Sequence, residues 1–307
     1  MLSFEGDVFS FGWGADCALG HGDEQSQLAP RRVEALDGVR VGAVCAGLGF
    51  SLALGREGAL YSWGANSHYQ CGHCEDPVIL PPAMVVARPT LVESVRSVRL
   101  AGVSAGDLHM LAFSREGVAY SSGSNARGQA GKGLRLSGDG YDGLRAVGSL
   151  EGLRVSAVAA GALHSLVVMR EGGLYAFGEG GQGRLGLGDE DSRTLPAQVT
   201  ALAGLRVVAV SAGDEFSLAL ASDGRVFSFG RGRGGPLGHG GDADELLPRA
   251  LGALAGVRVR AVVAGNGHSL AVGAPAFGGG SPVFSWGGHA YYRAEDLPIH
   301  VPGLAVR

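Results

Sequence analysis

The stretch Val226-Phe227-Ser228-Phe229-Gly230 decides the fold, because its pattern occurs six times along the chain. The glycine that closes it is called here the anchor glycine. Three residues before each anchor stands Phe or Tyr, and two residues before it stands Ser or Ala. This alternation of large and small side chains predicts a β-strand with two different faces. The six anchors are Gly12, Gly64, Gly123, Gly178, Gly230 and Gly287.

Two further landmarks keep register with the anchors. An Ala-Gly pair such as Ala212-Gly213 precedes a short apolar strand, here Ser217–Leu220, and a Gly-rich turn follows each of the first five anchors. The segment between that turn and the next Ala-Gly pair varies in length and often carries a proline, as at Pro30 and Pro248. Variable length predicts a surface loop.

Each unit therefore comprises an aromatic strand, a Gly-rich turn, a variable loop, a Val-rich strand and a Ser-Leu-Ala-Leu strand. A unit of about 50 to 60 residues with about four strands is typical of a propeller blade. We predict an all-β chain that forms a single β-propeller domain over residues 1–307, with about six blades. The repeats are expected at 6–57, 58–116, 117–171, 172–223 and 224–280, with a partial sixth at 281–307.

These motifs resemble the regulator of chromosome condensation repeat family. The resemblance rests on Val226–Gly230, on the turn Gly128-Gln129-Ala130-Gly131 and on the Ala-Gly-x-x-His-Ser-Leu strands at Ala160–Leu166 and Ala264–Leu270. The family usually has seven blades, so a ring of about six blades, an open arc and an incomplete seven-bladed ring all stay open. Leu2 aligns with Leu54, which predicts that the chain starts inside a blade. An open arc would expose a strand edge that pairs with another chain.

Composition excludes several classes of protein. Of 307 residues 55 are Gly, yet no collagen period exists, and 18% charged residues with a net charge of −4 fit neither disorder nor a nucleic-acid-binding surface. We expect no membrane span, because no apolar run is long enough. Met1–Gly12 lacks the features of a secretory signal, and four cysteines do not make a disulfide scaffold. The expected location is the cytoplasm, with the nucleus as an alternative.

Residues with reactive side chains are best interpreted as structural. Cys71-Gly72-His73-Cys74 occupies a Gly-rich turn rather than the helix N-terminus that activates a redox thiol. His109, His164 and His268 share one repeat position, which Phe takes in two other units, so we expect packing residues there. His21, His73 and His239 share another position and receive the same interpretation. We therefore predict no catalytic, cofactor or metal site and no enzymatic activity.

Partner contacts are expected where the repeat does not dictate the sequence or where charges follow a turn. The irregular segments are Glu75–Ser94 and Leu134–Val147. An aromatic residue among charges suits a protein contact. The candidate partner-binding residues are Arg135, Asp139, Tyr141 and Asp142 of the second segment, Arg231 and Arg233 after an anchor, and Asp214 and Glu215 after an Ala-Gly pair; Asp107 follows another such pair.

Three functions are compatible with these features. The leading hypothesis is a non-enzymatic protein-interaction scaffold that uses the propeller loops. The resemblance also implies an alternative, guanine nucleotide exchange on a Ran-like small GTPase, with that GTPase as the protein partner. A minor alternative is UV-B reception, because plant UV-B photoreceptors are similar to this family. Their Gly-Trp-Arg-His-Thr signature is absent, and Trp63 and Trp286 stand where core residues are expected.

Overall fold

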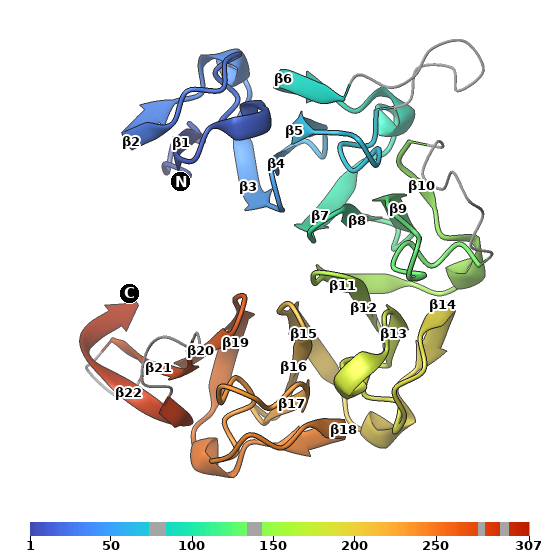
Figure 1. Cartoon of the computed structure of the whole chain (residues 1–307), viewed down its shortest axis with the longest axis vertical. Coiled ribbons are helices and arrows are strands. Elements are labelled where there is room, and N and C mark those ends of the chain that lie inside the picture. The colour runs from blue at the N-terminus through green and yellow to red at the C-terminus, as the bar shows by residue number, and fades with distance from the viewer. Residues whose placement is uncertain (74–83, 134–142, 276–279, 289–294, 307) are drawn as a thin grey trace. The chain divides into compact units, whose positions relative to one another are not determined.

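The computed structural model describes residues 1–307 apart from 74–83, 134–142, 276–279, 289–294 and 307 (Figure 1). The chain divides into two compact units, Met1–Leu153 and Arg154–Arg307, which are described separately below. The regular elements of the described residues are β-strands and short 3₁₀ helices. The predicted all-β class is confirmed.

The first unit contains one two-stranded and two four-stranded antiparallel sheets. The two-stranded sheet is β1 (Phe9–Gly12) and β2 (Gln27–Arg32). The others are β3 (Val41–Ala46), β4 (Phe50–Gly55), β5 (Leu60–Ala65) and β6 (Val85–Leu91), then β7 (Leu100–Ala105), β8 (His109–Ser114), β9 (Ala119–Gly123) and β10 (Arg145–Ala146). The 3₁₀ helices are η1 (Ala15–Cys17), η2 (Glu34–Leu36), η3 (Glu93–Val95) and η4 (Gly148–Leu150).

The second unit contains three four-stranded antiparallel sheets. They comprise β11 (Val155–Ala160), β12 (His164–Met169), β13 (Leu174–Gly178) and β14 (Arg193–Gln198); β15 (Val207–Ala212), β16 (Phe216–Ala221), β17 (Val226–Gly230) and β18 (Glu245–Ala250); and β19 (Val259–Ala264), β20 (His268–Gly273), β21 (Ser281–Gly287) and β22 (Glu295–Val306). The 3₁₀ helices are η5 (Gly181–Gly183), η6 (Thr200–Leu202) and η7 (Gly252–Leu254).

Each four-stranded sheet begins with the Val-rich strand and continues with the Ser-Leu-Ala-Leu strand and the aromatic strand. In the sheet β15–β18, Leu218 pairs with Ser228 and Phe216 with the anchor Gly230. A sheet thus joins the end of one predicted repeat to the start of the next. The six sheets confirm the prediction of about six blades, and the two-stranded one lies at the start of the chain. The prediction of a single domain and the exact repeat limits remain predictions.

The proline-bearing strand at the edge of five sheets corrects the sequence interpretation. The proline-bearing segment was expected to be a surface loop, but it forms β2, β6, β14, β18 and β22, each at the edge of its sheet. Part of the supposedly irregular Glu75–Ser94 is likewise β6, and Arg145–Ala146 of the second irregular segment is β10. Proline lacks the N–H that an inner strand must donate, so an edge is the place in a sheet that accepts it. Proline therefore marked the edge strand rather than a loop.

A close contact requires the glycine of four of the Ala-Gly pairs, at Gly47, Gly161, Gly213 and Gly265. An added Cβ at Gly213 would collide with the ring of Phe216, and one at Gly161 would collide with the ring of His164. The aromatic or imidazole ring three residues later thus lies directly on the glycine. This contact explains why Phe and His both occur in that slot, because both supply a flat ring.

In three sheets the serine two residues before the anchor is part of a recurring hydrogen-bond arrangement. Ser228 Oγ donates to the carbonyl of Leu237 at 2.7 Å and lies 2.8 Å from Nε2 of His239. Since the hydroxyl proton is used on the carbonyl, His239 must donate its Nε2–H. Burial lowers the pKa of His239, which keeps the ring neutral. The same arrangement joins Ser10 to Leu19 and His21, and Ser62 to Cys71 and His73.

Successive sheets within each unit are joined by a recurring hydrogen bond besides apolar packing. A serine of one sheet donates to a carbonyl in the Gly-rich turn of the sheet before it. The bonds are Ser51 to Ala18 (3.0 Å), Ser122 to Tyr69 (2.7 Å), Ser217 to Arg184 (2.8 Å) and Ser269 to Pro236 (2.9 Å). Trp63 and Trp286 donate their indole N–H to two of the same carbonyls, and both are buried as predicted.

Replacement of Gly232 by alanine is expected to destabilise the second unit by about 2 to 4 kcal/mol. An added Cβ there would collide with the backbone carbonyl of Ala243, which has no flexible end to move aside. Gly252→Ala is the control, because nothing lies within 4 Å of its added Cβ. It should change stability by less than about 1 kcal/mol. Urea unfolding of both variants measures the difference, and equal effects would contradict the steric explanation.

The Ser228–His239 pair is expected to behave as one structural element. Ser228→Ala should cost about 1 to 3 kcal/mol, because it removes a buried hydrogen bond and leaves the imidazole without its acceptor. Ser228→Ala with His239→Leu should recover part of that loss, because Ala176 and Leu187 occupy the same two positions in the sheet β11–β14. Chemical unfolding of the single and double variants tests the coupling. Additive losses in the double variant would show that the two side chains act independently.

Candidate partner-binding site

The site is formed by two turns of the sheet β15–β18 and by one turn of the sheet β11–β14, all within the second unit. Asp214 and Glu215 lie in the turn from β15 to β16, and Arg231 follows β17. The backbone fixes the two turns together, because Arg231 N–H donates to the carbonyl of Glu215 at 2.9 Å. The predicted candidates Asp214, Glu215 and Arg231 are therefore neighbours.

Glu215 lies between two arginines. Its Oε1 lies 3.3 Å from Nη2 of Arg184, and its Oε2 accepts a hydrogen bond from Nη1 of Arg231. The side chain of Arg184 is only 5% exposed, against 33% for Glu215 and 41% for Arg231. The carboxylate thus neutralises a buried cation on one side and orients a half-exposed cation on the other.

Arg184 is held on several sides. Its Nε donates to the carbonyl of Gly181 at 3.0 Å, and its Nη1 donates to the carbonyl of Asp214 at 3.3 Å. Burial lowers the pKa of Arg184, and the carboxylate of Glu215 opposes that effect. Planar guanidinium groups suit such multiple bonding, since they present five donors in fixed directions. Sequence reasoning missed Arg184, although it stands at a repeat position where Ala18, Gln70 and Pro236 are uncharged.

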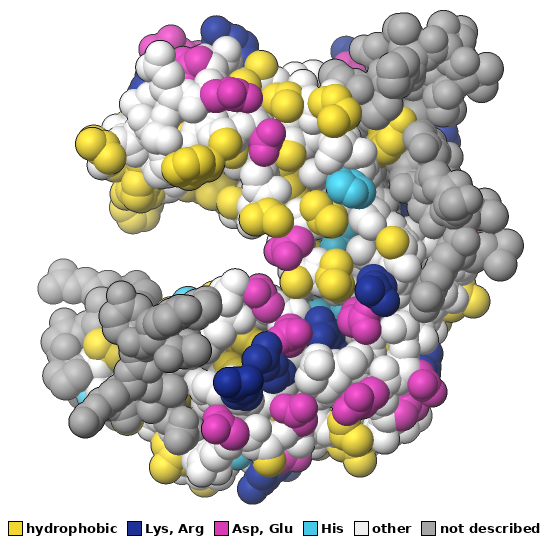
Figure 2. Space-filling model, viewed as in Figure 1, with side chains coloured by type: hydrophobic (Ala, Val, Ile, Leu, Met, Phe, Trp, Pro, Cys, Tyr) yellow, Lys and Arg dark blue, Asp and Glu magenta, His cyan; other side chains and the backbone are white. Residues whose placement is uncertain are grey.

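The loop after β17 presents a second arginine. Its backbone is held by Gly232 N–H, which donates to Oδ1 of Asp244 at 2.8 Å, and by Gly234 N–H, which donates to Asp242. Arg233 lies between these two anchored residues and is exposed. It forms no ion pair with any acidic side chain that the structure describes. Figure 2 shows basic and acidic side chains side by side over the sheets of the second unit.

The other predicted candidates do not join this site. Arg135, Asp139, Tyr141 and Asp142 lie outside the described residues, so their role stays a prediction. Asp107 belongs to the first unit and is half-buried, and burial raises the pKa of its carboxyl. Nothing in the chemistry of Asp107 indicates a reactive group.

The cysteine and histidine motifs have structural surroundings. Cys71 is buried, lies 3.3 Å from the carbonyl of Ala65, and burial raises its pKa to about 12, so the thiol stays protonated. Its potential partner Cys74 lies outside the described residues.

His109 and His164 are buried, and His164 Nε2 bonds Ser217 Oγ at 2.9 Å. His268 is more exposed, but its ring lies on Gly265 in the same way as the ring of His164 lies on Gly161. Within the described ranges, no group of three or more His, Cys, Asp or Glu side chains is arranged to hold a metal ion.

The repeated antiparallel blades and their charged turns define a propeller protein whose exposed surface is made of turns and edge strands. The RCC1-like domain matches residues 1–296, and the chain belongs to that family. The fold class is thereby confirmed as a β-propeller of the regulator of chromosome condensation type. No helix among the described residues is long and apolar enough to cross a membrane.

Curated relatives are similar over most of this chain. The chain is 33% identical over 268 residues to the ultraviolet-B receptor UVR8 of Arabidopsis thaliana, covering 86% of this chain and 58% of that protein. It is 33% identical over 306 residues to the human E3 ubiquitin-protein ligase HERC2, covering 98% of this chain and 6% of that protein. The chain therefore spans less than two thirds of the length of these relatives.

Solved structures are similar in fold. Human WBSCR16 matches with a TM-score of 0.83 at 24% identity, over 97% of this chain and 81% of that one. Prp20p of Saccharomyces cerevisiae matches with a TM-score of 0.66 at 20% identity, over 98% of this chain and 87% of that one. At these identities the likeness establishes the shared fold alone.

The ion pair between Glu215 and Arg184 is expected to stabilise the second unit. Glu215→Gln should cost about 2 kcal/mol, because it removes the carboxylate that is paired with the buried guanidinium and leaves only the charge of Glu179 to oppose its burial. The matched change Asp223→Asn removes an exposed carboxylate from Arg225 and should cost much less, because solvent screens that pair. Urea unfolding at neutral pH compares the two. A loss in Glu215→Gln no larger than that in Asp223→Asn would show that Arg184 does not need the carboxylate.

Proposed function

We propose that this chain is a non-enzymatic protein-interaction module whose partner contacts the turns around Glu215, Arg231 and Arg233. The observation that carries the proposal is the carboxylate of Glu215 between a buried and a half-exposed arginine. A guanidinium already held in position loses little rotamer freedom when a partner binds it. The turns around it are fixed by backbone hydrogen bonds, so the surface is preorganised.

The chemistry of this surface favours a partner with an acidic patch. Arg231 bonds Glu215 through its Nη1, and Arg233, which stands two residues further along the chain, is exposed. Arginine is enriched at the centres of protein interfaces, where it forms bidentate bonds to carboxylates. The half-exposed Glu215 and Asp214 next to it favour a partner that also carries a basic or hydrogen-bond-donating group. The surface is thus mixed in charge, which supports specific recognition rather than general attraction.

The similar proteins agree with a role in recognition. Prp20p is described with binding properties to Gsp1p and histones, UVR8 is a receptor, and HERC2 is a ubiquitin ligase of which this chain matches 6%. These descriptions support a protein partner in general terms. The identity of the partner, a cytoplasmic or nuclear location and the absence of catalysis remain predictions for this chain.

Nucleotide exchange and UV-B reception remain predictions with simple tests. Acceleration of nucleotide release from a Ran-like GTPase would favour exchange, and a change of oligomeric state under UV-B would favour light reception. Trp63 and Trp286 are buried and donate hydrogen bonds to turn carbonyls, which favours a packing role for both. Neither alternative has a specific arrangement of residues to support it over the interaction module.

The double change Arg231→Gln with Arg233→Glu is expected to weaken partner capture strongly. Affinity purification from a lysate, with quantitative mass spectrometry, should recover proteins on the unchanged chain that fall on the order of tenfold on the variant, as for loss of an interface hot spot. Arg225→Glu is the control, because Arg225 pairs with the exposed Asp223 in the turn between β16 and β17. Equal losses in the control and the double variant would reject this site, and no specific partner on the unchanged chain would reject the function.

A further inference from the structure

One position of the repeat is different in the sheet β11–β14. It stands two residues before the aromatic residue of the aromatic strand, and in this sheet it is Gly173, before Tyr175. The other sheets carry side chains there, which are those of Asp7, Ala59, Val118, Arg225 and Pro282. An added Cβ at Gly173 would lie 3.8 Å from Cε2 of Tyr175 and 4.0 Å from Nε2 of Gln198, which is ordinary van der Waals contact. Space for a side chain therefore exists at this glycine.

A pocket of about 380 Å³ opens beside Gly173, within the second unit. Its walls are the turn from β12 to β13 on one side and η6 with the residues that follow it on the other. Its apolar and polar side chains are those of Leu174, Val199 and Leu202, and of Glu171, Gln198 and Arg206. An apolar wall beside a carboxylate and an amide suits a long side chain with a polar end.

The next sheet shows what this position can hold. In the sheet β15–β18 the same position is Arg225, whose Nε donates to Oδ2 of Asp223 at 2.8 Å. The guanidinium carbon of Arg225 lies 5.7 Å from the centre of the Phe227 ring. In the sheet β11–β14 the positions of this carboxylate and this ring are taken by Glu171 and Tyr175. That sheet therefore keeps the carboxylate and the aromatic ring of the arrangement and lacks its cation.

The first sheet places a guanidinium here from another strand. Arg32 of β2 is the register partner of Phe9, and its Nη2 donates to Oδ1 of Asp7 at 2.7 Å. In the sheet β11–β14 the position of Arg32 is taken by Gln198, the register partner of Tyr175, whose amide carries no charge. Two sheets thus hold a guanidinium paired with a carboxylate at this end of the aromatic strand, although the arginine comes from different places in the repeat.

The charges around the pocket are compatible with an added cation. Glu171 is exposed and forms no ion pair with any basic side chain that the structure describes. Arg206 lies close to this turn, since its Cγ would lie 2.7 Å from an added Cβ at Gly172. In the next sheet Cγ of Arg258 would lie 2.9 Å from an added Cβ at Gly224, in the turn that also carries a guanidinium. Two cations are therefore accommodated at this end of a sheet when a carboxylate accompanies them.

We propose that the pocket beside Gly173 binds the arginine side chain of a protein partner. The guanidinium would pair with the carboxylate of Glu171 and lie against the ring of Tyr175 and the amide of Gln198. The aliphatic stem would cover the apolar wall of the pocket. A guanidinium is favoured over an ammonium, because its planar group pairs with a carboxylate and also stacks on an aromatic ring.

This pocket is separate from the site around Glu215. The turn that carries Glu215 joins the first two strands of its sheet, whereas the turn that carries Glu171 joins the second and third, so the two lie at opposite ends of the strands. The choice of a protein as the source of the arginine rests on the proposed function. The chemistry of the pocket does not involve Glu215, so each of the two proposals can fail alone.

The test titrates the whole chain with a blocked peptide, acetyl-Gly-Gly-Arg-Gly-Gly-amide, and follows the backbone amide signals by NMR. One ion pair and one ring contact give weak binding, so half-saturation on the order of 1 mM is expected. The amide signals of Glu171 and Gly173 should shift along a saturable curve. Peptides with lysine, glutamine or glutamate in place of the arginine should each bind about threefold or more weakly.

Two variants and a control locate the binding. Gly173→Arg supplies the guanidinium within the chain, as Arg225 does in the next sheet, and should block peptide binding. This variant is expected to fold, because Gly173 has no positive φ and an added Cβ meets only van der Waals contacts. Glu171→Gln should weaken binding about threefold or more through loss of the counter-charge. Glu190→Gln should bind normally, since Glu190 is also exposed but follows the anchor Gly178 at the other end of the sheet.

The proposal is wrong if the unchanged chain shows no saturable shift with the arginine peptide, or an equal one with the glutamine peptide. Tighter binding of the glutamate peptide would show that Arg206 attracts an anion instead. Unchanged binding by a Gly173→Arg variant that unfolds in urea like the unchanged chain would place the peptide elsewhere, as would equal affinities of Glu171→Gln and Glu190→Gln. Free arginine that binds as tightly as the peptide would reject a protein as the source.

Discussion

The hydrogen bond from a serine of one sheet to the turn carbonyl of the sheet before it is the interaction on which the structure depends. It occurs at each junction between successive sheets within the two units, at donor–acceptor distances of 2.7 to 3.0 Å. A buried carbonyl without a partner costs free energy comparable to a lost hydrogen bond, so the turn must lie where the serine is. The turn that this bond fixes is also the turn that carries the exposed charges.

This constraint links packing to recognition at Arg184. Its backbone carbonyl accepts from Ser217 of the next sheet, while its guanidinium reaches Glu215 in the turn before that serine's strand. The same residue therefore positions the sheet and the surface carboxylate. A partner that binds Arg231 would contact a surface fixed by the core rather than a free loop.

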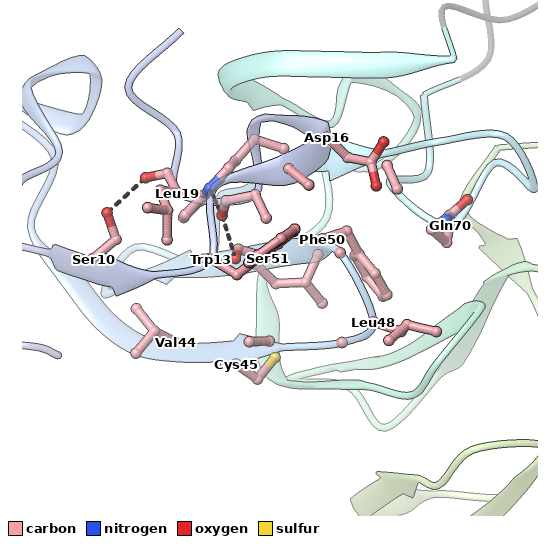
Figure 3. Close-up of a pocket in the computed structure, with 18 of the residues that line it drawn as sticks. Ser10, Trp13, Asp16, Leu19, Val44, Cys45, Leu48, Phe50, Ser51 and Gln70 are labelled. Atoms are coloured by element: carbon pink, nitrogen blue, oxygen red, sulfur yellow. Dashed lines mark hydrogen bonds between the residues drawn. The ribbon is translucent and has the colours of Figure 1, made fainter. Parts of the chain in front are cut away.

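The two-stranded sheet β1–β2 differs from the four-stranded sheets in the surroundings of its aromatic strand. Where Val-rich and Ser-Leu-Ala-Leu strands are present, they pair the aromatic strand and cover the next sheet. Beside β1 the same aromatic pattern ends in the exposed Trp13 and a cavity of about 830 Å³ (Figure 3).

The sequence by itself determined the blade. The spacing of the anchor glycines, the aromatic residue three before each and the Ala-Gly pairs are local requirements of strand alternation and of a ring lying on a glycine, so they recur in register. The sequence also indicated Glu215 and Arg231, because charges followed predicted turns. Only the tertiary structure decided that Pro248 lies in an edge strand, that Arg184 is buried against Glu215, and that Trp13 is exposed while Trp63 is covered. The position of a residue in its sheet and the burial of its side chain depend on which neighbouring strand or turn packs beside it. The repeat motif is nearly the same in each blade, so the local sequence does not encode which neighbour that is.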